Sequence, residues 1–138
     1  MPYWRLFYHL VWATKGRAPL LDDLRGAVVE RSIRSTCDEP GMHLFDLALM
    51  LDHVHLVVSI PPRLAISGVV QRLKGASSFA ANGADLPPQA NRFAWQNEYG
   101  IFSFGEKSLP TVIDYVRNQT ARHAANTLWP ALERLTDP

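Results

Sequence analysis

The sequence of 138 residues lacks several features that would place a protein in a narrow class. Its single cysteine, Cys37, excludes a disulfide framework and a cysteine-based zinc site. The N-terminus does not have the basic-then-apolar layout of a signal peptide, and no apolar run reaches the roughly 18 residues of a membrane span. The net charge of +1 neither predicts nor excludes a polyanionic partner. We therefore expect a cytoplasmic protein that does not enter membranes and forms one domain over residues 1–138.

Hydrophobic alternation predicts four strands, at about 3–14, 42–50, 53–60 and 95–104. Helices are expected between the first and second strands, between the third and fourth, and after the fourth. This order is the ferredoxin-like βαββαβ arrangement followed by one more helix, which is an α+β fold. Right-handed crossovers would place the first two helices on one face of an antiparallel sheet and leave the other face bare.

Each expected helix has its own start signal and apolar face. Asp22 can cap the first helix, which ends before Pro40, and Ser108 can cap the last, with Pro110 in its first turn. The second helix begins near Ser67 and stops at about Asn82. The predicted inward residues are Leu24, Ala27 and Val28 in the first helix and Val69, Leu73, Ala76 and Ala80 in the second.

Two histidines, His53 and His55, interrupt the apolar third strand. Residues i and i+2 of a strand share a face, so the two imidazoles can converge on one metal ion. Their parity is opposite to that of the apolar residues, which predicts that they lie on the face without the first two helices. Two core histidines with satisfied hydrogen bonds are the simpler alternative. His9 on the neighbouring first strand is expected nearby, as a hydrogen-bonded sheet residue, and Asp52 as a turn residue or a support for the pair.

A polar row accompanies the apolar stripe of the last helix. Tyr115, Asn118, Gln119 and Arg122 recur at helical spacing, where a plain surface helix would more often carry Glu and Lys. On this helix alone, a tyrosine at the core margin with solvated neighbours explains the row equally well. Because the histidine pair is expected on the face where this helix could dock, the combined pattern favours a catalytic site.

Four ordered segments resemble the HUH superfamily of nucleases, and most closely the single-tyrosine transposases of insertion sequences, the TnpA type that moves single-stranded DNA. The resemblance covers nearly the whole chain. The segments are Tyr8-His9-Leu10-Val11-Trp12-Ala13-Thr14-Lys15, Asp52-His53-Val54-His55-Leu56-Val57-Val58-Ser59, Gln71-Arg72-Leu73-Lys74-Gly75-Ala76-Ser77-Ser78 and Tyr115-Val116-Arg117-Asn118-Gln119.

The resemblance implies a site and a reaction. His53, His55 and Gln119 would hold a divalent metal, Mg²⁺ or Mn²⁺, and Tyr115 would be the nucleophile that forms a 5′-phosphotyrosine link to DNA. The substrate would be single-stranded DNA with a hairpin at the ends of the element. The resemblance also implies a homodimer in which the tyrosine helix of one chain completes the histidine site of the other.

Basic and aromatic residues supply candidate DNA contacts. Arg72, Lys74, Arg117 and Arg122 could bind phosphates, although a solvated charged surface explains each of them as well. Trp95, Tyr99 and Phe102 could stack on unpaired bases, and at least two of them are expected in the core. The resemblance also extends to the Lys74-Gly75 step, where the glycine would let a backbone approach.

Three other readings compete with an active transposase. A catalytically silent DNA-hairpin-binding protein of the same fold is disfavoured by the intact set of site residues. An RNA-binding or small-ligand domain of this fold would carry a basic and aromatic signature on the third strand, where this chain has His-Val-His. A two-histidine phosphodiesterase would need a second His-x-Ser/Thr repeat, and none exists in the sequence.

Overall fold

A four-stranded antiparallel sheet organises the chain, and residues 3–83 and 91–119 are described in this computed structural model. The strands are β1 (Phe7–Ala13), β2 (His43–Leu49), β3 (His53–Ser59) and β4 (Gly100–Phe104), in the spatial order β2-β3-β1-β4. The helices are α1 (Asp23–Thr36), α2 (Ile66–Gly83) and α3 (Leu109–Arg117), with short 3-10 turns η1 (Lys15–Arg17) and η2 (Glu106–Ser108). The predicted ferredoxin-like order is confirmed.

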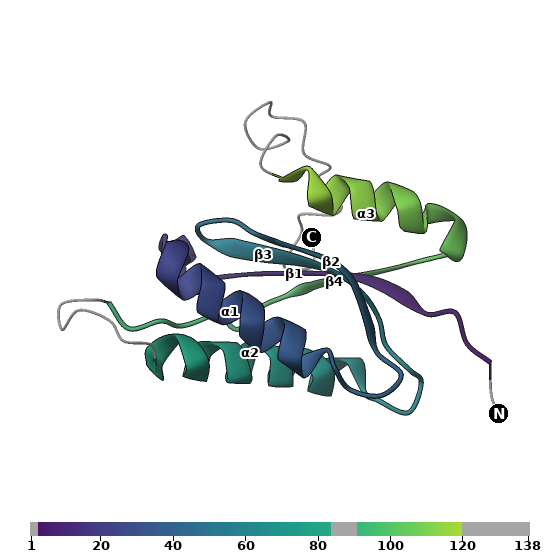
Figure 1. Cartoon of the computed structure of the whole chain (residues 1–138), viewed down its shortest axis with the longest axis horizontal. Coiled ribbons are helices and arrows are strands. Elements are labelled where there is room, and N and C mark those ends of the chain that lie inside the picture. The colour runs from purple at the N-terminus through teal and green to yellow at the C-terminus, as the bar shows by residue number, and fades with distance from the viewer. Residues whose placement is uncertain (1–2, 84–90, 120–138) are drawn as a thin grey trace.

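The helices lie on both sides of this sheet. Figure 1 shows α1 and α2 together below the sheet and α3 above it. The larger core lies on the side of α1 and α2, where alternate residues of the central strands, such as Leu10, Trp12, Leu56 and Val58, are buried. A smaller cluster of Val57, Val112, Tyr115 and Val116 lies between the sheet and α3. The face left bare by the first two helices is therefore covered by the last helix.

The buried faces of α1 and α2 differ from the prediction. In α1 the buried residues are Arg25, Val29 and Ile33, whereas Leu24 is 48% exposed. In α2, Ser77 and Ala81 are buried where Ala76 and Ala80 were expected. The predicted stripe of α1 is therefore one position out of place, whereas that of α2 is right at Val69 and Leu73 and is displaced by one position after them. In α1 the buried guanidinium of Arg25 donates to the Asn91 carbonyl, a partner that the local sequence does not indicate.

Two strands are also shorter than predicted. The first begins at Phe7 and the fourth at Gly100, although an isolated bridge joins Thr14 to Trp95. Asp22 caps α1 as predicted by accepting a hydrogen bond from the Arg25 amide. Ser108 precedes α3, but its side chain makes no cap bond, since η2 continues directly into the helix.

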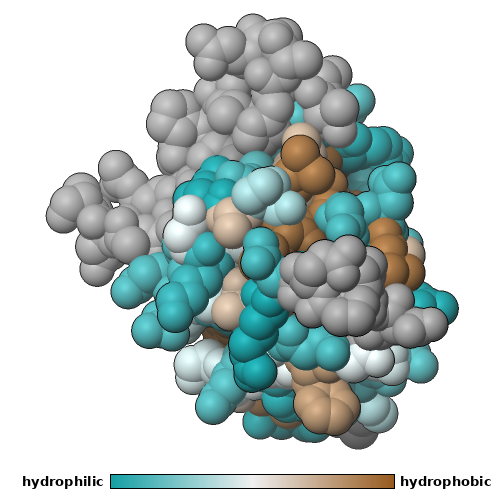
Figure 2. Space-filling model, turned by 90° about the vertical axis from the view of Figure 1, so that its left-hand side faces the viewer, coloured by the Kyte–Doolittle hydropathy of each residue, from teal (hydrophilic) through white to brown (hydrophobic). Residues whose placement is uncertain are grey.

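The outer surface is mainly hydrophilic on the side shown in Figure 2, with hydrophobic side chains among the polar ones. Large apolar side chains that are exposed include Leu51 at 61% and Phe79 at 83%. No helix within 3–83 or 91–119 is long and apolar enough to cross a bilayer.

Candidate functional site

His53 and His55 lie on the face of β3 that α3 covers, as their parity predicted. Both are buried, at 3% and 0% exposure, and their ring centroids are 5.1 Å apart. The pair therefore sits under a helix, and neither imidazole projects into open solvent. This position satisfies the geometric expectation that the two rings share one face.

His9 joins the pair from β1. Its Nε2 lies 2.9 Å from Nδ1 of His55, and the two rings are nearly parallel with centroids 5.1 Å apart. The register places Val11 opposite His55 and His9 opposite Val57, so the two histidines are diagonal neighbours across the β1–β3 ladder. The sequence predicted a hydrogen-bonded sheet residue here, and the structure shows that its partner is one of the two candidate ligands.

Asp52 contacts the other histidine. Its Oδ1 lies 2.7 Å from Nδ1 of His53, and its Oδ2 accepts a hydrogen bond of 3.1 Å from Nε of Arg17. Burial raises the pKa of the Asp52 carboxyl, but the hydrogen bonds and charges of His53 and Arg17 outweigh it, and the net pKa is lowered. Burial lowers the pKa of His53, and the bond to Asp52 only partly opposes this effect.

Tyr115 comes to the same place from the opposite side. It is fully buried on α3, and its ring centroid lies 6.4 Å from those of both His9 and His55, in edge-on orientation. Val112 and Val116, one turn before it and one residue after it, pack α3 against Val57 of β3. The tyrosine predicted as nucleophile and one predicted metal ligand are thus neighbours within a single chain.

Gln119 lies one turn beyond Tyr115 and is 1% exposed. Its Nε2 donates to the Tyr115 carbonyl at 3.2 Å, whereas its Oε1 has no hydrogen-bond partner among the described residues. A buried amide oxygen without a partner is costly unless a ligand or an ion satisfies it. Two imidazoles and this oxygen are a donor set that a divalent ion accepts. No cluster of three or more His, Cys, Asp or Glu with metal-binding geometry occurs in the described part of the chain.

The predicted polar row of the last helix does not form one surface. Tyr115 and Gln119 are buried, whereas Asn118 is exposed and donates back to the carbonyl and carboxylate of Asp114. Arg122 lies outside the described residues. The buried members of the described part of the row are therefore Tyr115 and Gln119, four residues apart.

The predicted DNA-binding cations that the structure describes, Arg72, Lys74 and Arg117, lie on both sides of the sheet. Arg72 on α2 lies 3.5 Å from Glu39, while Arg117 on α3 lies 3.2 Å from Asp46 on the other side of the sheet. Lys74 is held by the main chain, because its Nζ donates to the carbonyls of Gln96 (2.6 Å) and Glu98 (3.3 Å).

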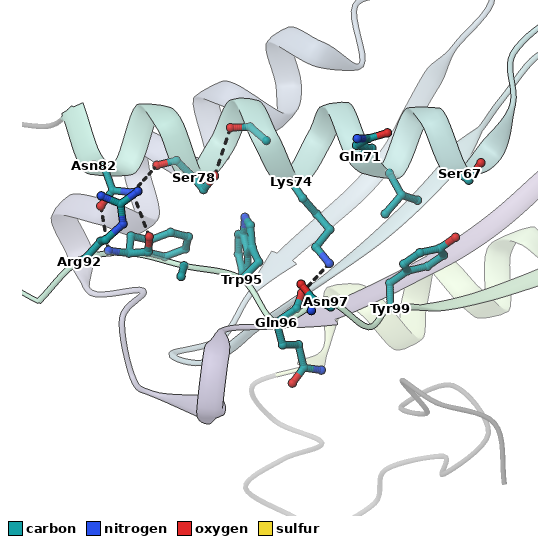
Figure 3. A pocket seen from close by; sticks show the side chains of 14 residues that line it. Ser67, Gln71, Lys74, Ser78, Asn82, Arg92, Trp95, Gln96, Asn97 and Tyr99 are labelled. Carbon is teal, nitrogen blue, oxygen red and sulfur yellow. Dashed lines mark hydrogen bonds between the residues drawn. The ribbon is translucent and has the colours of Figure 1, made fainter.

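Lys74 lines a cavity of about 470 Å³ between α2 and residues 92–99. Figure 3 shows its side chain crossing from α2 to this segment, with Tyr99 and Trp95 on either side. Trp95 donates to Ser77 Oγ and packs on Trp12, so it is largely structural. Phe102 is likewise engaged, since its ring stacks on His9.

The expected approach of a backbone at Gly75 stays a prediction. A Cβ atom built on Gly75 would meet nothing within 4 Å. Gly75 is exposed on α2, so the surface at the Lys-Gly step is open and no described segment of this fold occupies it.

Comparison with known proteins gives one consistent result. Residues 2–119 match the family described as IS200-like transposase. The transposase of insertion element IS200 from Salmonella typhimurium is 28% identical over 119 residues, which cover 84% of this chain and 78% of that relative. The ISDra2 transposase TnpA of Deinococcus radiodurans is 29% identical over 84% of this chain and 85% of its own length.

Solved structures share the fold. A crystal structure of a candidate transposase from Deinococcus radiodurans matches with a TM-score of 0.66 and 29% identity, over 86% of this chain and 95% of that one. A REP-associated tyrosine transposase bound to a REP hairpin has the same TM-score at 14% identity, over 99% of this chain and 93% of its own. The fold is therefore that of small transposases. This chain belongs to the IS200-like transposase family.

Proposed function

We propose that this protein is a metal-dependent tyrosine transposase that cleaves and rejoins single-stranded DNA at the ends of an insertion sequence. Tyr115 is the nucleophile, and His53, His55 and Gln119 hold Mg²⁺ or Mn²⁺. The observation that supports this assignment best is the meeting of Tyr115 with His55, at 6.4 Å between ring centroids, from opposite sides of one buried site. Family membership supports the DNA chemistry, and the geometry supports this choice of residues.

In the proposed reaction one phosphorus–oxygen bond forms as another breaks, so the number of bonds to phosphorus is unchanged. The Tyr115 phenol oxygen forms a bond to the 5′ phosphate, its proton is released, and the bond to the preceding 3′ oxygen breaks, which leaves a free 3′-hydroxyl. The reverse step, with a different 3′-hydroxyl as the attacking group, rejoins strands without ATP. A phenol has a pKa near 10, so phenolate is a tolerable leaving group. A bound divalent ion would neutralise phosphate charge and polarise phosphorus.

Gln119 ties the metal site to the nucleophile. It follows Tyr115 by four residues, and its amide donates to the Tyr115 main-chain carbonyl, so the Gln119 side chain is held at the residue that carries the nucleophile. Because Nε2 of Gln119 donates to the main chain, Oε1 is the atom that remains to bind a metal. Docking of α3 would then deliver the nucleophile and the oxygen ligand together.

Full burial of Tyr115 indicates that DNA enters when α3 leaves the sheet. We extend the proposal to a homodimer in which α3 of one chain completes the histidine site of the other. The packing of α3 depends on a small cluster, with Val57 on the sheet and Val112 and Val116 on the helix. An equivalent surface on a second copy could receive the same helix.

The proposed partner is a DNA hairpin at the element ends. The REP-associated relative of the same fold is bound to a REP hairpin. Lys74 could contribute one phosphate contact, because an ammonium group has three N–H donors and two carbonyls account for two of them. Arg72 and Arg117 would exchange their carboxylate partners for phosphates, and Arg122 is the fourth candidate.

An adduct assay tests the chemistry. The protein is incubated with Mn²⁺ and labelled single-stranded DNA that contains the element ends, and a denaturant-resistant protein–DNA adduct is expected. Tyr115→Phe should abolish the adduct, whereas Tyr8→Phe, a tyrosine of β1 that packs on the core of α1 and α2, should retain it. Equal adduct formation by Tyr115→Phe would reject this nucleophile. Hairpin binding without any adduct would identify a silent DNA-binding protein.

Mixed dimers test completion in trans. Tyr115→Phe and His55→Ala chains are each expected to be inactive alone. If sites are completed across the dimer, a mixed dimer contains one site with both intact groups, so adduct formation returns on mixing. If each chain uses its own tyrosine, every site carries one defect and the mixture stays inactive.

A further inference from the structure

Both predicted histidine ligands use the same ring nitrogen for a neighbour in the protein. Nδ1 of His53 lies 2.7 Å from Asp52 Oδ1, and Nδ1 of His55 lies 2.9 Å from His9 Nε2. An ionised carboxylate can only accept hydrogen bonds, so the proton lies on Nδ1 of His53. This places the lone pair of that ring on Nε2, which is the nitrogen a metal would use.

We propose that Asp52 and His9 are positioning residues that set the tautomer and ring orientation of His53 and His55, so that both Nε2 atoms are directed at one divalent cation. The inference rests on the proposed metal site. It goes beyond that site because it assigns a role to two residues outside the proposed ligand set. Metal-ligating histidines in proteins usually donate their other N–H to such a partner.

Asp52 is itself held from several sides. Its backbone carbonyl accepts from the Thr14 amide at 2.8 Å, its Oδ2 accepts from Arg17, and its Oδ1 contacts His53. Arg17 reaches Asp52 from a left-handed backbone conformation, with φ of 59°, directly after Gly16 with φ of 64°. Residues other than glycine rarely adopt this conformation. The turn after β1 thus keeps the Asp52 carboxylate from rotating away from the histidine.

His9 is held by stacking. The edge of its ring meets the edge of His55, with Nε2 2.9 Å from Nδ1 and 7° between the ring planes, and Phe102 stacks on it at 5.7 Å and 29°. When His55 binds a metal through Nε2, its Nδ1 keeps the proton and donates to His9 Nε2. His9 must then carry its own proton on Nδ1. A phenylalanine at position 9 would preserve the stacking but could not accept this hydrogen bond.

Metal affinity without DNA is the first test. Mn²⁺ binding to the intact protein is measured by electron paramagnetic resonance for wild type, Asp52→Ala, Asp52→Asn, His9→Phe and His9→Gln. Loss of the acceptor in Asp52→Ala and His9→Phe should weaken Mn²⁺ binding by about 10- to 100-fold, as for other outer-shell partners. Asp52→Asn and His9→Gln retain an acceptor and should recover part of the affinity.

Asp46→Ala is the matched control. Asp46 is a carboxylate on the adjacent strand β2, and its ion-pair partner is Arg117. It should leave Mn²⁺ affinity unchanged. Wild-type affinity in Asp52→Ala and His9→Phe, together with lost binding in His53→Ala, would overturn the positioning roles and leave the metal site intact. Unchanged binding in His53→Ala and His55→Ala would overturn both.

A spectroscopic measurement avoids substitutions altogether. Long-range ¹H–¹⁵N correlation spectra of the metal-free wild-type protein distinguish the two neutral tautomers of each histidine. His53 is expected as the Nδ1–H tautomer. An Nε2–H tautomer for His53 would contradict the inference even if every variant failed to fold.

Discussion

Docking of α3 depends on Val116, and truncating this side chain gives a quantitative test of the arrangement. Val116 is fully buried against Val57, next to Tyr115. Val116→Ala removes two buried methyl groups, at about 0.8 kcal/mol each, and leaves a cavity that adds to this cost. The higher helix propensity of alanine offsets about 0.5 kcal/mol. We expect the free energy of unfolding to fall by about 1.5–2.5 kcal/mol.

Urea denaturation measures this change, and Thr111→Ala on the exposed side of the same helix is the control. The control should stay within about 0.5 kcal/mol of wild type. Hydrogen exchange should also accelerate in residues 109–117 of Val116→Ala. If Val116→Ala is as stable as Thr111→Ala, α3 does not dock through this cluster. If α3 exchanges between chains, the loss will vary with protein concentration.

Three further predictions concern other parts of the fold. Burial raises the pKa of the Cys37 thiol from 9.0 to about 11, so between these pH values only the unfolded chain loses the proton. Stability should therefore fall by up to about 2.7 kcal/mol over that range, relative to Cys37→Ala, in urea titrations at pH 8 and 11. In the same assay Val29→Ala should cost about 1.5–2.5 kcal/mol and Leu24→Ala less than about 0.5, and equal losses would contradict the observed face of α1. Lys74→Met, which removes the bond to the Gln96 carbonyl, should cost about 1 kcal/mol, and an unchanged midpoint would show that this tie contributes nothing.

The sheet and its histidine face could be predicted because a strand has a side-chain period of two. Once Val54, Leu56 and Val58 were assigned to the core of α1 and α2, His53 and His55 had to lie on the opposite side. The faces of α1 and α2 were harder to predict, because a helical period admits neighbouring stripes of similar hydrophobicity. In α1 the burial of Arg25 depends on a carbonyl from residue 91, 66 positions away, and no local pattern contains that information.

For the candidate site, too, the sequence predicted some features and not others. The family resemblance predicted Tyr115, His53, His55 and Gln119, and the structure buries all four and brings Tyr115 next to His55 between the sheet and α3. The contacts of His9 and Asp52 were only partly foreseen, since they depend on the β1–β3 register and on the left-handed turn at Arg17. The cations were predicted by type, but their carboxylate and carbonyl partners come from distant elements.

The central claim is that Tyr115 attacks DNA, and mass spectrometry of the trapped adduct tests it most directly. The adduct formed with Mn²⁺ and single-stranded DNA is digested with nuclease and protease, and the peptides are sequenced by fragmentation. We expect a nucleotide phosphate on Tyr115, in the peptide that continues Val116-Arg117. A nucleotide on any other residue, or an adduct whose Tyr115 peptide is entirely unmodified, would contradict the account.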